Sequence, residues 1–510
     1  MSSPVKLLEY ESLKIVLLHM EANMRLQLSQ RLPSLLLIEK AVPLKIRYLK
    51  FEKNRTTVNQ TVYTLGISRE YPPDQVVPAL IQKQNAEGGI CIDLDEFGFS
   101  ETNEELTLGD VDVRRPQLAA INEFNEPPEN YEERRIRAEK RLRIYEKALT
   151  RRLESDKMEE REVVQIVVQS LLDTVSGSAH QFYQFQLPNY KVPPIPHVWN
   201  RQHPDYFQWL LEVQEEILDA EEIEVCTVSS YPISRIRALR DRAEYEWLPF
   251  FYCEKNQKPP YSYAIQLTIQ NKQEIKIQKY DYNMKYKEAM KKLNTVILKG
   301  RTVLMRKLVV HRKITILRLP ENRKVKVKEL KINVDALNRF WATLDPSSYP
   351  LNVLSLTQAV VGQAAVISQS RIIRESQRLI IHNHNFSQQS WINILRDLPN
   401  RSVELKYQGR TFHKEDFTGL VRNWLGAGRP VGSNFSFGIS KQTTARKVMI
   451  LVEMLPEARR VCEHKINIPM NNGSQLIVSC TQVSGDVTPL LFLNRDYSTR
   501  WILKMKVVEG

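Results

Sequence analysis

The sequence contains few cysteines and none of the short motifs that identify common enzyme classes. Only five cysteines occur among 510 residues. No two of them lie within four positions, so neither a CxxC metal or redox motif nor a disulfide framework is indicated. A P-loop, an HExxH motif and a GxSxG motif are all missing. With no nucleophile–base pair to nominate, we predict a protein that is not an enzyme and holds no metal or cofactor.

One segment has a partial likeness to a calcium-binding loop. Asp93, Asp95, Gly98 and Glu104 stand at four of the five marker positions of such a loop. The remaining marker position is Phe97, which has no side-chain oxygen, and no helical pattern precedes the segment. Calcium requires about six to eight oxygen ligands between two helices. We interpret this segment as an acidic turn.

Long hydrophobic segments are also missing. Four charged residues interrupt the apolar N-terminus, namely Lys6, Glu9, Glu11 and Lys14, which excludes a signal peptide. The longest weakly polar run, Leu351 to Ser368, is too short and too polar to cross a bilayer. We expect a cytoplasmic or nuclear protein without a membrane partner.

Positive charge is abundant and concentrated. The chain has 73 Lys and Arg against 59 Asp and Glu, a net charge of +14. Residues 271–331 alone hold 19 basic and 5 acidic residues, so 19 − 5 = +14. An opposite run, residues 212–224, has seven acids and no base. The candidate anion-binding residues are Lys291, Lys292, Arg306, Lys307, Arg312, Lys313, Arg323, Lys324, Lys326 and Lys328.

Three interpretations of the basic stretch remain open. It can be a solvated strand face, a site for a nucleic acid or another polyanion, or a contact for an acidic protein. Few aromatic residues that could stack on bases are interspersed (Tyr280, Tyr282 and Tyr286), and no homeodomain, zinc-finger or RRM signature occurs.

The first 40 residues predict compact helices. An apolar stripe of Leu13, Val16, Leu17 and Met20 has helical spacing. Asn23 is a candidate N-cap for a second helix, which Pro33 ends.

Composition and periodicity divide the rest of the chain. We predict strands at 44–51 and 57–66 and a helix at 73–85, then helices at 205–222, 233–246 and 284–296 with strands at 261–270 and 274–282. The expected units are a helical segment 5–40, an α+β segment 41–112, a linker 113–130, a charged helical arm 131–175, a proline-rich loop 176–204, an α+β segment 205–300 and an α/β array 301–510.

The helical arm has two interpretations. Ala138, Leu142, Tyr145, Leu149 and Leu153 form a narrow stripe with coiled-coil spacing over little more than two heptads. Residues 131–172 therefore either pack on their own chain or mediate self-association of a scaffold protein.

An irregular repeat marks the C-terminal half. Apolar residues at i, i+3 and i+5 recur at Met305, Val327 and Leu351, and shorter echoes follow at Leu379, Val403 and Phe435. Helical candidates at 334–344, 388–397 and 413–425 fill the gaps. A strand and a helix every 20 to 30 residues or so is the leucine-rich-repeat period. Either an array of this type or an ordinary α/β domain fits, and both give a mixed α/β fold class.

Short stretches in a fixed order resemble the nematode F-box C protein family, which is built around a domain of unknown function. They are EKAVPLKI (39–46), YTLGI (63–67), GI (89–90), DEFG (95–98), YEER (131–134), LPFF (248–251), YSYAIQLTI (261–269), LNT (293–295) and SSYPL (347–351). The resemblance covers about residues 7–356. The remainder, including Asn423-Trp424-Leu425, is similar to nematode F-box-associated domains.

The resemblance implies that residues 7–38 are a degenerate F-box, a helical unit that docks on the adaptor of a cullin-RING ubiquitin ligase. The matching adaptor-binding positions are Leu13, Val16, Leu17, Met20, Arg25, Leu26 and Leu28. Leu7-Leu8-Glu9 stands where the family pattern has Leu-Pro, and no Trp follows Arg31. The protein is thus expected to be a substrate-recognition subunit that binds a target protein through its C-terminal array.

Overall fold

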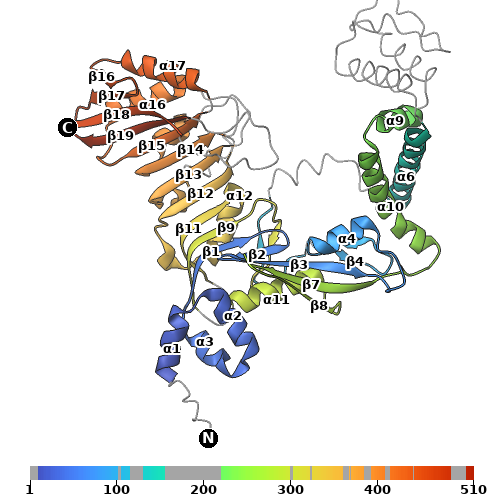
Figure 1. The fold of residues 1–510 in the computed structure, drawn as a ribbon. Helices are drawn as coiled ribbons and strands as arrows, with labels where there is room; N and C mark the ends of the chain where they lie inside the picture. The colour runs from blue at the N-terminus through green and yellow to red at the C-terminus, as the bar shows by residue number, and fades with distance from the viewer. Residues whose placement is uncertain are drawn as a thin grey trace, which may run out of the picture.

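The chain forms a mixed α/β fold, as predicted, around one continuous sheet (Figure 1). A computed structural model describes residues 10–101, 105–114, 130–154, 220–298, 302–321, 324–359, 367, 369–383, 392–407, 414–439, 441–483 and 501–510. The proline-rich loop 176–204 and most of the linker 113–130 and of the helix 205–222 lie outside these residues. The predicted unit boundaries stay predictions.

The sheet has 15 strands in the order β16-β17-β18-β19-β15-β14-β13-β12-β11-β9-β1-β2-β3-β7-β8. Their bounds are β1 (Leu44–Phe51), β2 (Arg55–Val58), β3 (Thr61–Glu70), β7 (Ser262–Gln270), β8 (Ile275–Asp281), β9 (Val303–Val310), β11 (Lys326–Asn333), β12 (Val353–Ala359), β13 (Arg378–Asn383), β14 (Ser402–Tyr407), β15 (Asn434–Ile439), β16 (Arg459–Cys462), β17 (Lys465–Pro469), β18 (Ser474–Gln482) and β19 (Trp501–Glu509). Two small ladders pair β4 (Asp93–Leu94) with β5 (Ser100–Glu101) and β6 (Val111–Asp112) with β10 (Ile316–Leu317).

The predicted repeat is confirmed as a run of parallel strands. β9, β11, β12, β13, β14 and β15 are hydrogen-bonded neighbours in this order, and every pair is parallel. The apolar residues of the repeat are buried in one core. Between the strands lie α12 (Val334–Phe340), α14 (Arg371–Glu375), α15 (Ile392–Asp397), α16 (Lys414–Ala427) and the short 3-10 helices η3 (Trp341–Thr343) and η4 (Pro346–Ser348), with α17 (Gln442–Glu453) after β15.

The sheet continues across the expected boundary at residue 300. Strand β1 has the predicted bounds and pairs in parallel with β9, although more than 250 residues separate them. The prediction of a single strand at 57–66 is wrong. A turn divides it into the antiparallel hairpin β2–β3, and Asn59 in this turn has a φ of 55°. Asparagine tolerates this left-handed conformation better than most residues do.

The helix predicted at 73–85 begins later than expected, as α4 (Ala79–Ala86). Pro72, Pro73 and Pro78 precede it, and proline disfavours helical backbone in the residue before it. The predicted strands 261–270 and 274–282 are β7 and β8, and the helix at 284–296 is α11 (Tyr286–Leu298).

The charged arm packs on its own chain. Helix α6 (Tyr131–Glu154) contacts α9 (Ala220–Ser229) and α10 (Ile233–Glu254), which form a separate group of helices at one end of the molecule (Figure 1). Ile144 and Ala148 of α6 are buried against Val225 and Ile236. Glu221, from the acidic run, pairs with Arg143 at 2.7 Å and Lys147 at 2.9 Å. Tyr145 and Leu149 of the predicted stripe pack against this core, whereas Leu153 is 55% exposed, so intramolecular packing covers only part of the apolar face that self-association would need.

The N-terminal unit consists of α1 (Tyr10–His19), α2 (Ala22–Arg31), the 3-10 helix η1 (Pro33–Leu35) and α3 (Leu36–Ala41). The proposed Asn23 cap is wrong, because the side chain of Glu21 accepts hydrogen bonds from the backbone N–H groups of Asn23 and Met24. Asn23 instead donates from Nδ2 to the carbonyl of Val58 at 3.0 Å and accepts from the Tyr63 hydroxyl at 3.0 Å. It ties the unit to the β2–β3 hairpin.

A buried ion pair holds this unit together. Arg25 and Glu39, each 1% exposed, lie 3.0 Å apart. Arg25 also donates to the carbonyl oxygens of Glu39, Val42 and Pro43, each at 2.8 Å. The arginine therefore fixes the chain just before β1 starts.

We expect Arg25→Met to destabilise the N-terminal unit by about 3–5 kcal/mol, because Glu39 would remain buried without its cation. Urea unfolding with hydrogen exchange of α1–α3 measures the effect. The double variant Arg25→Met with Glu39→Leu is the matched control and should lose less stability than the single variant. Equal losses would mean that the ion pair is not the reason for the effect.

Candidate interaction surface

The parallel strands bury one face and present the other outward. The rings of Phe417 and Trp424 in α16 pack on Phe437 and Phe435 of β15, which identifies the buried face. Because successive side chains alternate between faces, the residues between the buried positions point to the opposite side. We call this side of strands β1, β9, β11–β15 and β19 the open face.

Strand register gathers lysines on the open face. Lys50 of β1 and Lys331 of β11 both lie opposite Val309 of β9, one on each side. With about 4.8 Å between neighbouring strands, their Cα atoms are about 10 Å apart. Lys307 lies two residues before Val309 and points to the same side.

Lys331 is the central lysine of this group. It is half-buried, and burial lowers the pKa of its ammonium below the ordinary 10.5. The charges of Lys307, Lys406 and Lys50 lower this pKa further. Among the described residues no carboxylate forms an ion pair with Lys331 or Lys307. We call Lys50, Lys307, Lys331 and Lys406 the lysine cluster.

The acids of the open face already have partners. Glu404 of β14 pairs with Arg378 at 2.8 Å and with Lys406 at 3.3 Å. Burial alone would raise the pKa of Glu404, but these two cations hold it below 4.5. Glu52 pairs with Lys50 at 2.7 Å. The cluster therefore keeps an excess of positive charge.

Hydroxyl groups lie next to Lys331. Ser355 of β12 is its direct neighbour in register, and its Oγ is 3.2 Å from Nε2 of His382. Thr357 lies two residues further along the same face. Its Oγ1 is buried and has no hydrogen-bond partner among the described residues.

The basic residues nominated from sequence do not form one site. Lys307 belongs to the lysine cluster, whereas Arg306 pairs with Glu329 at 3.4 Å and Lys324 donates to the carbonyl of Ala342 at 2.8 Å. Arg323 lies outside the described residues. The remaining exposed members are Lys292, Arg312, Lys313, Lys326 and Lys328. Sequence reasoning did not nominate Lys331, the last residue of the basic stretch, and it missed Lys50 and Lys406, because only strand pairing brings them to Lys331.

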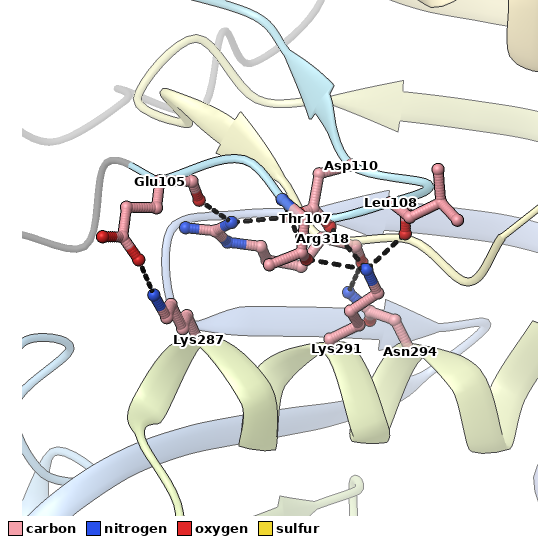
Figure 2. Close-up of polar contacts among 8 residues, drawn as sticks. All are labelled: Glu105, Thr107, Leu108, Asp110, Lys287, Lys291, Asn294 and Arg318. Atoms are coloured by element: carbon pink, nitrogen blue, oxygen red, sulfur yellow. Dashed lines mark hydrogen bonds and ion pairs between the residues drawn. The ribbon is translucent and has the colours of Figure 1, made fainter.

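Lys291 is engaged in an internal polar network (Figure 2). This lysine of α11 donates to Thr107 Oγ1 at 2.8 Å and to the carbonyl of Leu108, and lies 3.4 Å from Asp110. Lys287, one turn earlier, bonds to the carboxylate of Glu105. These contacts fasten the loop 105–110 to α11.

Asp110 and Arg318 form the buried part of this network. Their side chains approach to 2.6 Å, and the side chain of Asp110 is fully buried. Arg318 also donates to the carbonyl of Glu105 at 2.6 Å, and its own carbonyl accepts from Asn294 at 2.7 Å (Figure 2). Burial alone would raise the pKa of Asp110, but hydrogen bonds from Thr107 and the charge of Arg318 bring it below 3.8. The network is structural.

The residues matched to the adaptor-binding positions divide into two groups. Leu17, Arg25 and Leu26 are buried and hold the N-terminal unit together. Leu13, Met20 and Leu28 are half-buried, and Val16 is exposed. Other apolar side chains of the unit reach solvent, namely Tyr10, Ile15, Met24, Leu32 and Leu37, and Leu37 is 82% exposed.

The calcium-like segment is an internal turn. Oδ1 of Asp95 accepts the N–H groups of Phe97, Gly98 and Phe99, and Oδ1 of Asp93 accepts from the Tyr282 hydroxyl at 2.7 Å. Glu104 lies outside the described residues. Within the described ranges there is no grouping of three or more potential metal-ligating His, Cys, Asp or Glu residues. No described helix is long and apolar enough to cross a membrane.

We expect Asp110→Asn to cost about 3 kcal/mol or more at pH 7, because Arg318 would lose its buried counter-charge. Since folding lowers the pKa of Asp110, its carboxylate stabilises the fold above pH 3.8, and this contribution is lost as the pH falls through the folded-state pKa. Urea unfolding at several pH values measures the difference in unfolding free energy between the Asp110→Asn variant and the natural chain. This difference should become smaller below about pH 4. Asp74→Asn, at an exposed position, is the control. A difference that does not change with pH would contradict this assignment.

Comparison with known protein families gives a partial match. A family model described as Domain of unknown function (DUF3557) matches residues 285–441. This span starts at α11, runs through the parallel strands β9 and β11–β15, and contains three of the four residues of the lysine cluster. No curated protein and no solved structure matches the chain significantly. The matched family therefore corresponds to the part of the chain that builds most of the open face.

Proposed function

We propose that this protein is a non-catalytic interaction protein with two binding surfaces. The N-terminal unit docks on one partner, and the open face of the sheet binds a second. The observation that carries the proposal is the density of exposed apolar side chains on α1–α3. Such side chains on a small helical unit favour burial against a partner, because removing apolar surface from water is favourable.

The family resemblance names the first partner. If residues 7–38 are a degenerate F-box, the N-terminal unit docks on the adaptor of a cullin-RING ubiquitin ligase, and the chain is the substrate-recognition subunit. The exposed Val16 and the half-buried Leu13, Met20 and Leu28 are then available for contact. Leu17, Arg25 and Leu26 contribute by keeping the unit folded.

The second partner is a target protein on the open face. Parallel-strand arrays with helices on one side commonly use the uncovered strands for protein binding. The attachment of α2 to the sheet supports a protein in which one surface binds an adaptor and another binds a target. Asn23 and Arg25 fix the docking unit relative to β1, so an adaptor and a target would be held at a defined separation.

A docking variant has to alter exposed side chains only. A charge at Leu17 would unfold the unit, because this side chain is fully buried. Met24 and Leu37 are well exposed, so Met24→Glu with Leu37→Glu leaves the core intact. Val76→Glu, at an exposed apolar residue outside the unit, is the matched control.

We expect the full-length chain to co-purify stoichiometrically with at least one paralogue of the ligase adaptor. The double variant should reduce retention by about tenfold or more, which corresponds to the loss of about 1.4 kcal/mol of binding free energy. The control should bind like the natural chain. Failure of every paralogue to be retained, or equal retention by the double variant, would reject docking through this unit.

A further inference from the structure

Lys331 is an unusual residue for a solvent-facing sheet surface. It is half-buried, no described carboxylate pairs with it, and three other lysines lower the pKa of its ammonium. A protein gains nothing in stability from holding like charges together. Such an arrangement becomes favourable when an anion is present.

We propose that the lysine cluster binds a phosphate monoester dianion carried on a polypeptide segment of the target protein. This inference rests on the proposed function for the origin of the segment, but the site itself is defined by the sheet. Lys331, on β11, would contact the phosphate from the surface of the sheet beneath it. Lys50 and Lys307 would contact the phosphate from the neighbouring strands β1 and β9.

The chemistry around Lys331 suits a compact dianion. A phosphate group offers three strong acceptor oxygens, and hydrogen bonds from ammonium groups to phosphate are charge-assisted. Ser355 of β12, the register neighbour of Lys331, places a hydroxyl group directly beside the site.

The same surface does not suit a nucleic acid. Base stacking requires aromatic side chains along the path of the strand. Around the lysine cluster, the aromatic side chain in register is that of Tyr48, opposite Lys307.

A polypeptide carrier accounts for the rest of the surface. A free ion on an open face keeps much of its hydration, and lysine side chains alone hold it weakly. Ile380 of β13, half-buried on the open face, can contact an apolar side chain next to the phosphorylated residue. The net charge of the chain favours fast association with an acidic segment.

The test uses the full-length chain and two immobilised peptide libraries, one with a central phosphoserine and degenerate flanks, the other identical but unphosphorylated. We expect about tenfold greater retention on the phosphorylated library. Lys331→Met should reduce this retention to the level of the unphosphorylated library. Lys328→Met removes one exposed lysine from the same strand and should leave the retention unchanged.

Thermal unfolding is the folding control. Because Lys331→Met removes repulsion among the lysines, its Tm should equal or exceed that of the natural chain. Equal retention on both libraries would overturn the proposal, as would equal losses for Lys328→Met and Lys331→Met. A Lys331-dependent rise in Tm with inorganic phosphate, without preference for the phosphorylated library, would also overturn it, because the ligand would then be a free ion.

Adaptor binding separates this inference from the docking proposal. The Lys331→Met variant should retain the adaptor as the natural chain does, since α1–α3 are unchanged. Selective binding of the phosphorylated library without any adaptor binding would reject only the ligase role. Adaptor binding without phosphate selectivity would reject only the lysine site.

Discussion

The alternation of side chains along paired strands is the constraint on which the rest of this structure depends. Each parallel strand from β9 to β15 can satisfy its backbone only through its two neighbours, so their register is fixed along the whole array. The buried apolar residues then commit every intervening residue to the opposite side. The lysine cluster follows directly, because once Leu330 and Ile332 are buried, Lys331 has to face outward.

Lys291 and Lys331 show how neighbouring residues determine the role of a lysine charge. Lys291 contacts Asp110, Thr107 and a backbone carbonyl, and its charge is used to fasten a loop to α11. Lys331 lies in the same basic stretch of the sequence, but its register neighbours are Val309 and Ser355, and the nearby charges that act on its pKa are those of Lys307, Lys406 and Lys50. The first arrangement stabilises the fold without any ligand. The second leaves an excess of positive charge that the proposed phosphate would balance, and this contrast separates a structural cation from the proposed binding one.

Local patterns in the sequence were sufficient for much of the fold but for little of the candidate site. The i, i+3, i+5 spacing predicted β9, β11 and β12, because the periodic burial of apolar residues is a local property. The pairing of β1 with β9 was not predictable, since nothing near Lys50 indicates a partner more than 250 residues away. The basic stretch drew attention to residues 271–331, yet two of the four clustered lysines lie outside it. The hairpin turn at Asn59 was missed because threonine and valine on both sides have the composition of one strand.

The attachment of the N-terminal unit links the two proposed surfaces through a single strand. Arg25 binds the carbonyl oxygens of Val42 and Pro43, the residues that lead into β1, and Leu26 belongs to the same core as Leu44 and Ile46. The same strand carries Lys50 to the lysine cluster. A unit joined by a flexible linker would present a target at a range of distances from the adaptor. Here the buried ion pair with Glu39 and the shared core remove that freedom, so the distance between the two proposed partners would be set by the length of β1 and not by the chain entropy of a connecting segment.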